Sequence, residues 1–437
     1  MEAHCIMPSP ANGKKLSSFD VFCLGVNAII GSGIFLFPGL LAREAGPASI
    51  AVFLSCGILL TFVALCYAEL GSIYTSNGGS YVYAREAFGR DVGFAVGWMS
   101  WVTAIFSWAA VANAVSSYAG YFDPVFNTLV MGKCIACSLV LVLGILNYRG
   151  IKLGAWTVDT FTIAKLAPLM LFIAVGIFFV SGENYHPFWG RGTGTFGHAV
   201  FLALWPLQGF EIASLPAGET DNPQRAVPLA TIGSLLCVTA LYVLVQAVSV
   251  GVFAGLAAST EKPLADAAAV FMKPAGALIM AVGAMVSMVG YTAGNALGSP
   301  RFLSALAEDG FLSARLFAPH PRFHTPAGAI ILTTAITFCA ALVLNFQQLV
   351  ILSNLAVIGQ YLSTCGAVIV LRRTQPRLDR GFKIPFGSGI AAAGCIVSVW
   401  LMRQVDAAEL VCACGVLAVG LVVKKFIQVR AVTSPHS

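Results

Sequence analysis

Charged residues are scarce in this chain of 437 residues: they make up 10% of the sequence, whereas hydrophobic residues make up 58%. Soluble domains carry roughly 25% charged residues. The composition therefore excludes a soluble globular protein. The polar segments between the apolar runs are also too short to hold a soluble domain of ordinary size.

Several sequence motifs that mark catalytic, metal-binding or glycosylation sites are missing from the sequence. It contains no HExxH, no GxSxG and no pair of aspartates inside an apolar run, so an intramembrane enzyme is disfavoured. We expect no cofactor and no metal site. The twelve cysteines lie mostly in apolar runs, and the CxxC spacing of Cys134 and Cys137 has neither a second pair nor a nearby histidine, which favours packing. No Asn-x-Ser/Thr sequon occurs, which is compatible with a bacterial origin.

Repeated apolar runs of about 20 residues, the length that crosses a bilayer, dominate what is present. The predicted fold class is an all-α membrane protein with twelve transmembrane helices. We expect the spans near residues 20–44, 47–70, 92–118, 132–148, 153–180, 196–219, 227–252, 274–300, 326–345, 348–371, 387–403 and 407–424.

The basic residues predict the orientation of these spans. With both termini on the cytoplasmic side, eighteen of the 25 lysines and arginines fall in inner segments and six in outer ones. Such a bias is the positive-inside signal. Residues 1–19 hold no apolar core, so we expect a cytoplasmic tail and not a signal peptide, with a second tail at 425–437.

The first span is interrupted at Gly31-Ser32-Gly33. Lipid offers no water to satisfy freed backbone groups, so a span unwinds only inside protein or beside a cavity. If the helix resumes at Ile34, its free N–H groups suit a carboxylate, and the carbonyls of Ile29 and Ile30 suit an ammonium. The alternative is a small-residue face for helix packing.

The sixth span is interrupted around Pro206-Leu207-Gln208-Gly209, with Trp205 before the break and Phe210 and Glu211 after it. A carboxylate at this depth is costly, so Glu211 is expected to take up protons, hold a water network or pair with Lys165. Trp205 could cover a substrate and attract its ammonium through its ring, or it could simply be a buried aromatic.

A pair of interrupted helices, one in each half of a polytopic chain, is the best sequence indication of a transporter's substrate site. Two five-span units that begin at these breaks would form an inverted repeat, because five is an odd number. The expected organisation is residues 20–180 for the first repeat, 196–371 for the second, and 387–424 for two additional helices.

Six further residues could carry function. Lys165 lies roughly 18 Å inside its span, at 1.5 Å per residue, where an ammonium must pair or lose its proton; snorkelling to a helix end is the alternative. Glu69, at the inner end of the second span, is interpreted as an inner gate or loop anchor, or as a packing residue. Uncharged polar groups could line a pathway or bond between helices: Asn295, Ser299, Ser353 and Asn354.

The motifs, taken in order, resemble the bacterial amino acid permeases of the amino acid–polyamine–organocation superfamily over residues 18–425. They are Gly31-Ser-Gly-Ile-Phe35, Tyr67-Ala-Glu-Leu-Gly71, Gly78-Gly-Ser-Tyr-Val-Tyr83, Asn147-Tyr-Arg-Gly150, Gly209-Phe-Glu211, residues 219–228 and Ala307-Glu-Asp-Gly310.

The resemblance implies a five-plus-five inverted repeat and alternating access around a central amino acid site. It places the substrate carboxylate at Ser32 and Gly33, and the ammonium at carbonyls of Ile29, Trp205 and Gln208. The substrate-binding set is expected to be Ile29, Ile30, Gly31, Ser32, Gly33, Ile34, Trp205, Gln208 and Gly209, with Lys165 standing in for an ion and Glu211 and Phe210 at a gate or water network.

The resemblance leaves two functions open. Lys165 is similar to the lysine of sodium-independent permeases and exchangers, some of which use it for proton coupling, which implies sodium-independent, proton-coupled symport. A neutral or broad range of L-amino acids is expected because Lys165 adds a positive charge near the site and Glu211 is the only carboxylate nearby in the predicted spans. Trp205 is similar to the tryptophan of arginine and polyamine antiporters, which implies exchange of cationic substrates as the alternative. The expected partners are an amino acid, the lipid bilayer of a bacterial inner membrane and protons, with no nucleic acid, in a monomer or homodimer.

Overall fold

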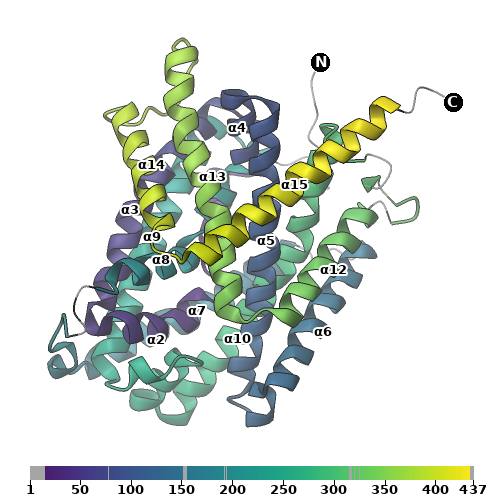
Figure 1. Cartoon of the computed structure of the whole chain (residues 1–437). Coiled ribbons are helices and arrows are strands. Elements are labelled where there is room, and N and C mark those ends of the chain that lie inside the picture. Colours follow the sequence, from purple (N-terminus) through teal and green to yellow (C-terminus); the bar gives the residue numbers. More distant parts are fainter. Residues whose placement is uncertain are drawn as a thin grey trace.

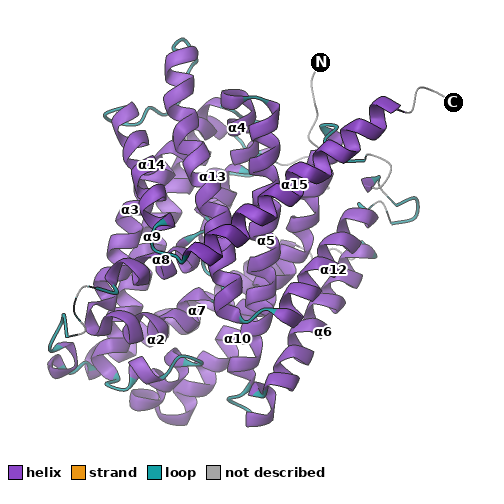
Figure 2. Ribbon diagram, viewed as in Figure 1, coloured by secondary structure: helices purple, strands orange, loops and turns teal. Residues whose placement is uncertain are grey.

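The computed structural model describes residues 15–433 except 77, 151–154, 191, 193, 314–316, 319 and 324; the side chains of residues 155–164 and 426–433 also lie outside the description. Most of the expected N-terminal tail and the last four residues of the chain are therefore not described. The described part is almost entirely helical and contains no strand, as Figure 2 shows.

The helices follow one another with short connections. Their bounds are α1 (Ser18–Ile29), α2 (Gly33–Ala45), α3 (Ser49–Ile73), α4 (Ser80–Phe88), α5 (Arg90–Ala119), α6 (Leu129–Tyr148), α7 (Ala155–Gly176), α8 (Phe196–Leu207), α9 (Pro223–Val252), α10 (Pro263–Glu308), α12 (Ala327–Val343), α13 (Phe346–Thr374), α14 (Ser388–Met402) and α15 (Ala407–Thr433). Short 3₁₀ turns connect some of them, including η5 (Phe210–Ser214) and η6 (Ala217–Glu219).

Seven helical segments of the described residues are long and apolar enough to cross a membrane, judged by length and composition. Shorter apolar helices are α1, residues 165–179, α12 and α14. The chain therefore has the helices of a multi-pass membrane protein. The number of twelve spans and the inverted repeat remain predictions.

Two helices differ from the sequence-based expectation. The short α4 was not anticipated; it starts directly after Gly78 and Gly79, whose φ angles of 129° and 51° reverse the chain before it. The long α10 begins before the expected span and contains a kink at Lys273, where φ is 56° and ψ is −157°. Pro274 follows the kink, and a residue before proline is disfavoured in helical conformation.

The helices pack as a bundle around α1, α5, α8 and α13. The main pairs are α3 with α9, α5 with α10 and α13, and α1 with α9. Figure 1 shows α6 and α12 side by side at one edge, and α15 crossing obliquely over the bundle near α5 and α13. Burial inside this bundle is what allows polar groups and broken backbone to exist at membrane depth.

Lys133 shows how a charged residue is accommodated in α6. Its ammonium donates to the carbonyls of Ala341 and Leu344, at 2.7 and 2.6 Å, and to the side chain of Asn113 at 3.0 Å. These carbonyls lie at the C-terminal end of α12, where the helix dipole favours a cation. We therefore interpret Lys133 as a cap that fixes α6 to α12.

Candidate functional site

The first break separates α1 from α2. Helix α1 ends at Ile29, residues 30–32 are not α-helical, and α2 begins at Gly33, one residue before the expected restart. The side chain of Ser32, the N-cap residue of α2, makes no capping hydrogen bond. The first N–H groups of a helix have no partner inside the helix, so this buried end is a potential anion site.

The second break follows α8. Pro206 lies in the last turn of α8, which ends at Leu207, and Gln208 is extended with ψ at 157°. Gly209 then has a φ of 120°, a conformation that favours glycine, and the chain continues as η5. Both breaks thus fall where the sequence predicts them.

The two breaks pack against each other through glycine. A Cβ atom built on Gly33 would lie 2.4 Å from Cβ and 2.7 Å from Cα of Pro206. A Cβ atom built on Gly209 would lie 2.7 Å from the carbonyl carbon and oxygen of Ala28. Such distances are too short for any side chain, so these glycines allow the backbone of each break to approach the other helix.

Lys165 binds the first break from α7. Its ammonium donates to the carbonyls of Ile30 at 2.7 Å and Asn27 at 2.9 Å, and the residue is only 3% exposed. The described residues include no ion pair of Lys165 with a carboxylate. The positive charge thus sits at the C-terminal end of α1, where the helix dipole is negative.

Other donors occupy the remaining carbonyls of this break. The hydroxyl of Tyr242 donates to Ile29 at 3.3 Å, and that of Ser287 donates to Gly31 at 3.0 Å. The ring of Tyr291 covers Gly31, so that a built Cβ there would lie 2.9 Å from it. The carbonyl groups at the end of α1 therefore receive hydrogen bonds from α7, α9 and α10. The N–H groups at the start of α2 receive no capping hydrogen bond from the side chain of Ser32.

Trp205 belongs to an aromatic group beside the second break. Its ring stacks on Phe37 of α2 with centroids 5.5 Å apart, and meets Phe346 edge-on at 5.6 Å. Its indole N–H is buried and has no hydrogen-bond partner among the described residues. Buried Trp N–H groups usually find a partner, so this donor is free for a ligand or water.

Gln208 begins a chain of polar side chains that leads away from the second break. Its amide nitrogen lies 3.4 Å from the hydroxyl of Ser353 on α13, which in turn lies 2.8 Å from the hydroxyl of Ser107 on α5. The amide oxygen of Gln208 and the hydroxyl of Ser32 are buried without a partner among the described residues. The breaks are thus surrounded by uncharged polar groups with spare hydrogen-bonding capacity.

Glu211 does not pair with Lys165. Its carboxylate accepts the backbone N–H of Gly209 at 2.9 Å and the hydroxyl of Tyr361 at 3.2 Å. Phe210 packs between Tyr67 and Tyr361, at centroid distances of 5.9 and 5.4 Å. The two residues expected at a gate therefore join α8 and η5 to α3 and α13 through one aromatic cluster.

The remaining sequence candidates lie apart from the breaks. Glu69 is buried at the end of α3, where it binds Arg372 and the backbone N–H of Ile384. Asn295 and Ser299 donate within α10, to carbonyls four residues earlier. Asn354 donates to the carbonyl of Phe201 in α8 at 2.9 Å.

Four residues near the breaks were not singled out from the sequence: Tyr242, Ser287, Tyr291 and Tyr361. Each is one of several polar side chains in a largely apolar helix, so residue type alone did not distinguish them from polar groups that bond elsewhere. Their role depends on how each helix is rotated toward the breaks, and that information is not local in the sequence.

Comparison with known proteins agrees with this architecture. The amino acid permease family matches residues 16–425 of the chain. In Bacillus subtilis (strain 168), a methylthioribose transporter is 28% identical over 409 residues, covering 90% of this chain and 89% of that protein. The branched-chain amino acid permease BcaP of the same organism is 30% identical over 411 residues, with coverage of 88% and 87%.

A further relative from Bacillus subtilis (strain 168), the serine/threonine exchanger SteT, is 30% identical over 386 residues, covering 85% of this chain and 86% of that protein. The match to the family extends over both breaks and over the helices that surround them. The chain belongs to the amino acid permease family of the amino acid–polyamine–organocation superfamily, and it is a membrane transporter and not an enzyme.

Proposed function

We propose that this protein is a secondary active transporter that carries neutral or broad-range L-amino acids by alternating access, without sodium, by proton-coupled symport. The substrate binds where the two breaks meet. Its carboxylate is received by the amide groups near Ser32 and Gly33, and its ammonium by carbonyls of the breaks, with those of Trp205 and Gln208 as acceptors.

One observation carries the sodium independence. The ammonium of Lys165 lies 2.7 Å from the carbonyl oxygen of Ile30, at the end of α1. A fixed cation there supplies the positive charge that a sodium ion would otherwise bring to the same carbonyls. Since Lys165 is buried and has no carboxylate partner in the described structure, its protonation is a means of coupling transport to a proton gradient.

The charges around the breaks support a neutral side chain on the substrate. The carboxylate nearest to the second break in sequence, Glu211, is already engaged by Gly209 and Tyr361. A cationic side chain would therefore lack a free counter-charge while Lys165 adds a positive one. The names of two relatives, a branched-chain amino acid permease and a serine/threonine exchanger, also refer to amino acids with uncharged side chains.

Exchange is the second candidate. It is supported by the similarity to a serine/threonine exchanger, since that match covers 85% of this chain and 86% of that protein. Exchange of cationic amino acids or polyamines is supported by Trp205 at the second break. The ring of Trp205 stacks on Phe37 and meets Phe346 edge-on, and its indole N–H has no hydrogen-bond partner among the described residues.

We further propose that the chain spans the membrane twelve times with both termini in the cytoplasm, as two inverted five-span repeats and two additional helices. The position of the breaks supports the repeat, since α1–α2 and α8–η5 are both interrupted near their midpoint. The distribution of lysine and arginine supports the orientation.

Uptake by purified protein in proteoliposomes tests these proposals together. A panel of neutral, cationic and acidic amino acids is offered with and without an inward proton gradient, and with and without unlabelled amino acid inside. Symport predicts that the gradient drives accumulation of a neutral amino acid into empty vesicles. Exchange predicts uptake only into vesicles preloaded with substrate, and a preference for arginine would contradict the neutral specificity.

A further inference from the structure

The connection between α13 and α14, residues 375–387, is a folded surface built around a buried acid. Glu69 of α3 is 1% exposed, and its carboxylate accepts from Nε of Arg372 at 2.8 Å and from the backbone N–H of Ile384 at 2.9 Å. Arg380 lies 3.4 Å from the same carboxylate. The hydroxyl of Ser72 holds the backbone of Phe382 at 3.0 Å.

Arg380 also fixes the backbone of the connection itself. Its guanidinium donates to the carbonyls of Pro376 and Leu378, at 3.2 and 3.0 Å, and to that of Gln375 at 3.2 Å. The connection is therefore tied both to α3 and to the end of α13. Its outward face is presented by a defined structure and not by a loose loop.

The connection and the end of α13 expose three basic residues and one aromatic ring. Arg373, Arg377 and Lys383 are exposed, and the described residues provide none of them with a hydrogen bond or ion pair. The only acid of the connection is Asp379. An open hollow of about 470 Å³ beside them is lined by residues 374–379.

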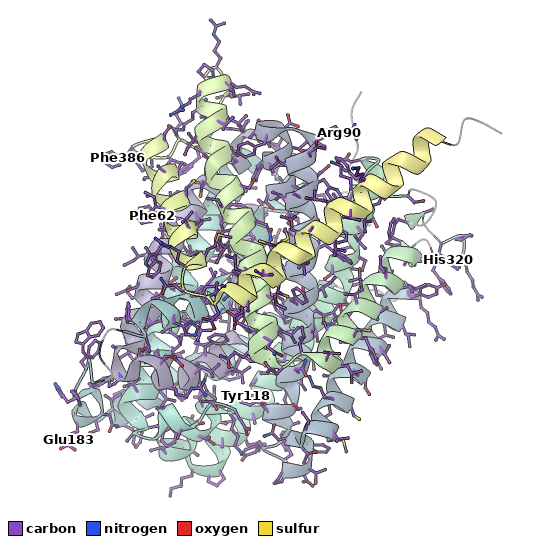
Figure 3. All side chains as sticks on the ribbon, in the orientation of Figure 1. Phe62, Arg90, Tyr118, Glu183, His320 and Phe386 are labelled. Carbon is purple, nitrogen blue, oxygen red and sulfur yellow. The ribbon has the colours of Figure 1, made fainter. Side chains whose placement is uncertain are left out.

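Phe386 completes this face. It is 92% exposed and has a φ of 56°, a conformation that favours glycine and is uncommon for a bulky residue. It lies two residues before Ser388, where the apolar helix α14 begins, and Figure 3 shows it at the periphery of the bundle. A strained backbone that exposes an aromatic ring calls for a functional explanation.

We propose that the surface formed by Arg373, Arg377, Lys383 and Phe386 binds the headgroup of an anionic phospholipid. Arginine and lysine match the lipid phosphate in charge and geometry, and basic residues beside a membrane helix are attracted to anionic lipid. Aromatic rings are enriched at the boundary between headgroups and acyl chains.

Phe386 is what selects a lipid over a soluble phosphate. An exposed ring gains from contact with acyl chains, whereas a free phosphate offers it no apolar contact. The inference rests on the two apolar helices, α13 and α14, that emerge beside the surface, and not on the identity of the transported substrate.

The test compares two triple variants of the full-length protein in detergent. The first is Arg373→Gln, Arg377→Gln and Lys383→Gln. The control removes the same charge from exposed arginines elsewhere, as Arg149→Gln, Arg225→Gln and Arg322→Gln. Retention of bound lipid is measured by native mass spectrometry while dioleoyl phosphatidylglycerol or dioleoyl phosphatidylcholine is titrated.

The proposal predicts that the wild type and the control triple retain phosphatidylglycerol in preference to phosphatidylcholine. The first triple should bind phosphatidylglycerol on the order of 100-fold more weakly, because each basic residue near an anionic surface contributes about fivefold. Equal loss in both triples, or no loss in the first, would overturn the proposal. Elution as a monodisperse peak with an unchanged melting temperature shows that the first triple is folded.

Phe386→Ser separates the lipid from other phosphates. It should weaken retention of phosphatidylglycerol while leaving the preference over phosphatidylcholine in place. Glycerol phosphate, a phosphomonoester that carries at least as much negative charge as the lipid headgroup and no acyl chains, should not compete. Competition by glycerol phosphate at equal concentration would mean that the surface is a soluble-anion site, and the proposal would be wrong.

Discussion

The ammonium of Lys165 and the carbonyl oxygen of Ile30 lie 2.7 Å apart, which joins α7 to the end of α1 at the first break. The same ammonium reaches Asn27, so one side chain satisfies two carbonyls that the end of the helix leaves free. A cation built into the protein thus takes the place where the helix dipole attracts one. We propose that the coupling of transport to protons depends on this contact.

Replacing this lysine should uncouple transport from protons. Lys165→Met removes two hydrogen bonds from a charged donor, each worth about 1.5–3 kcal/mol, so kcat/KM for uptake should fall by about tenfold or more. Uptake that remains should no longer respond to a proton gradient. Transport assays in proteoliposomes over a series of external pH values measure both effects.

Lys133→Met is the matched control for that variant. Lys133 also places its ammonium on carbonyls at a helix end, but at the end of α12. It should lower the melting temperature and leave the pH dependence of uptake intact. If Lys165→Met kept a wild-type pH dependence, or if Lys133→Met lost it, the coupling role of Lys165 would be refuted.

Ser32→Ala should weaken substrate binding without cost to the fold. The hydroxyl of Ser32 is buried and has no partner in the described structure, so its removal relieves an unsatisfied group. The melting temperature of the free protein should stay the same or rise, whereas KM should increase by about two- to tenfold if the hydroxyl binds the substrate carboxylate. An unchanged KM would show that this hydroxyl does not contact the substrate.

Gly209→Ala should destabilise the protein by at least about 2 kcal/mol, because a Cβ would require a strained φ and would meet the carbonyl of Ala28. Gly294→Ala is the control, since a Cβ there meets nothing within 4 Å and alanine is the better helix former. Thermal unfolding in detergent measures both. Equal melting temperatures of the two variants would contradict the packing of the breaks.

Tyr361→Phe should slow transport more than it weakens binding. The variant removes the hydroxyl from the carboxylate of Glu211 and leaves the backbone N–H of Gly209 in place. A net hydrogen bond is worth about 0.5–1.5 kcal/mol, so the maximal rate should change about two- to tenfold at similar KM. A change confined to KM would place Tyr361 in the binding site and not at a gate.

Substitutions at Gly33 are less informative than those at Ser32. A Cβ on Gly33 collides with the backbone of Pro206, so any larger residue disturbs packing between the two broken helices. Loss of transport in such a variant would therefore follow from either packing or substrate binding. Ser32, one residue earlier, separates the two because its hydroxyl makes no described hydrogen bond and its replacement by alanine adds no atom.

The sequence predicted the breaks well because their causes are local. Glycine and proline weaken a helix where they cluster, and Gly31, Gly33 and the Pro206–Gly209 segment therefore mark the breaks to within about a turn, although single prolines such as Pro168 stay inside helices. The burial of Lys165 could also be predicted, from the number of residues between it and the start of an apolar run. Both inferences need only residue type and position along the chain.

The partners of the breaks could not be predicted in the same way. Lys165 binds carbonyls and not Glu211, and Tyr242 and Ser287 supply hydrogen bonds that the sequence did not indicate. These contacts depend on the rotation and packing of helices that lie far apart in sequence. Hydropathy is nearly uniform around such buried helices, so it carries little information about which side faces the site.

Uptake with sodium replaced by choline is the most direct test of the account, because Lys165 is proposed to take the place of a sodium ion. Labelled neutral amino acid is offered to proteoliposomes of wild-type protein under an inward proton gradient, in sodium or in choline medium. The account predicts equal initial rates in both media and a lower rate when the proton gradient is dissipated. Uptake that required sodium would contradict it.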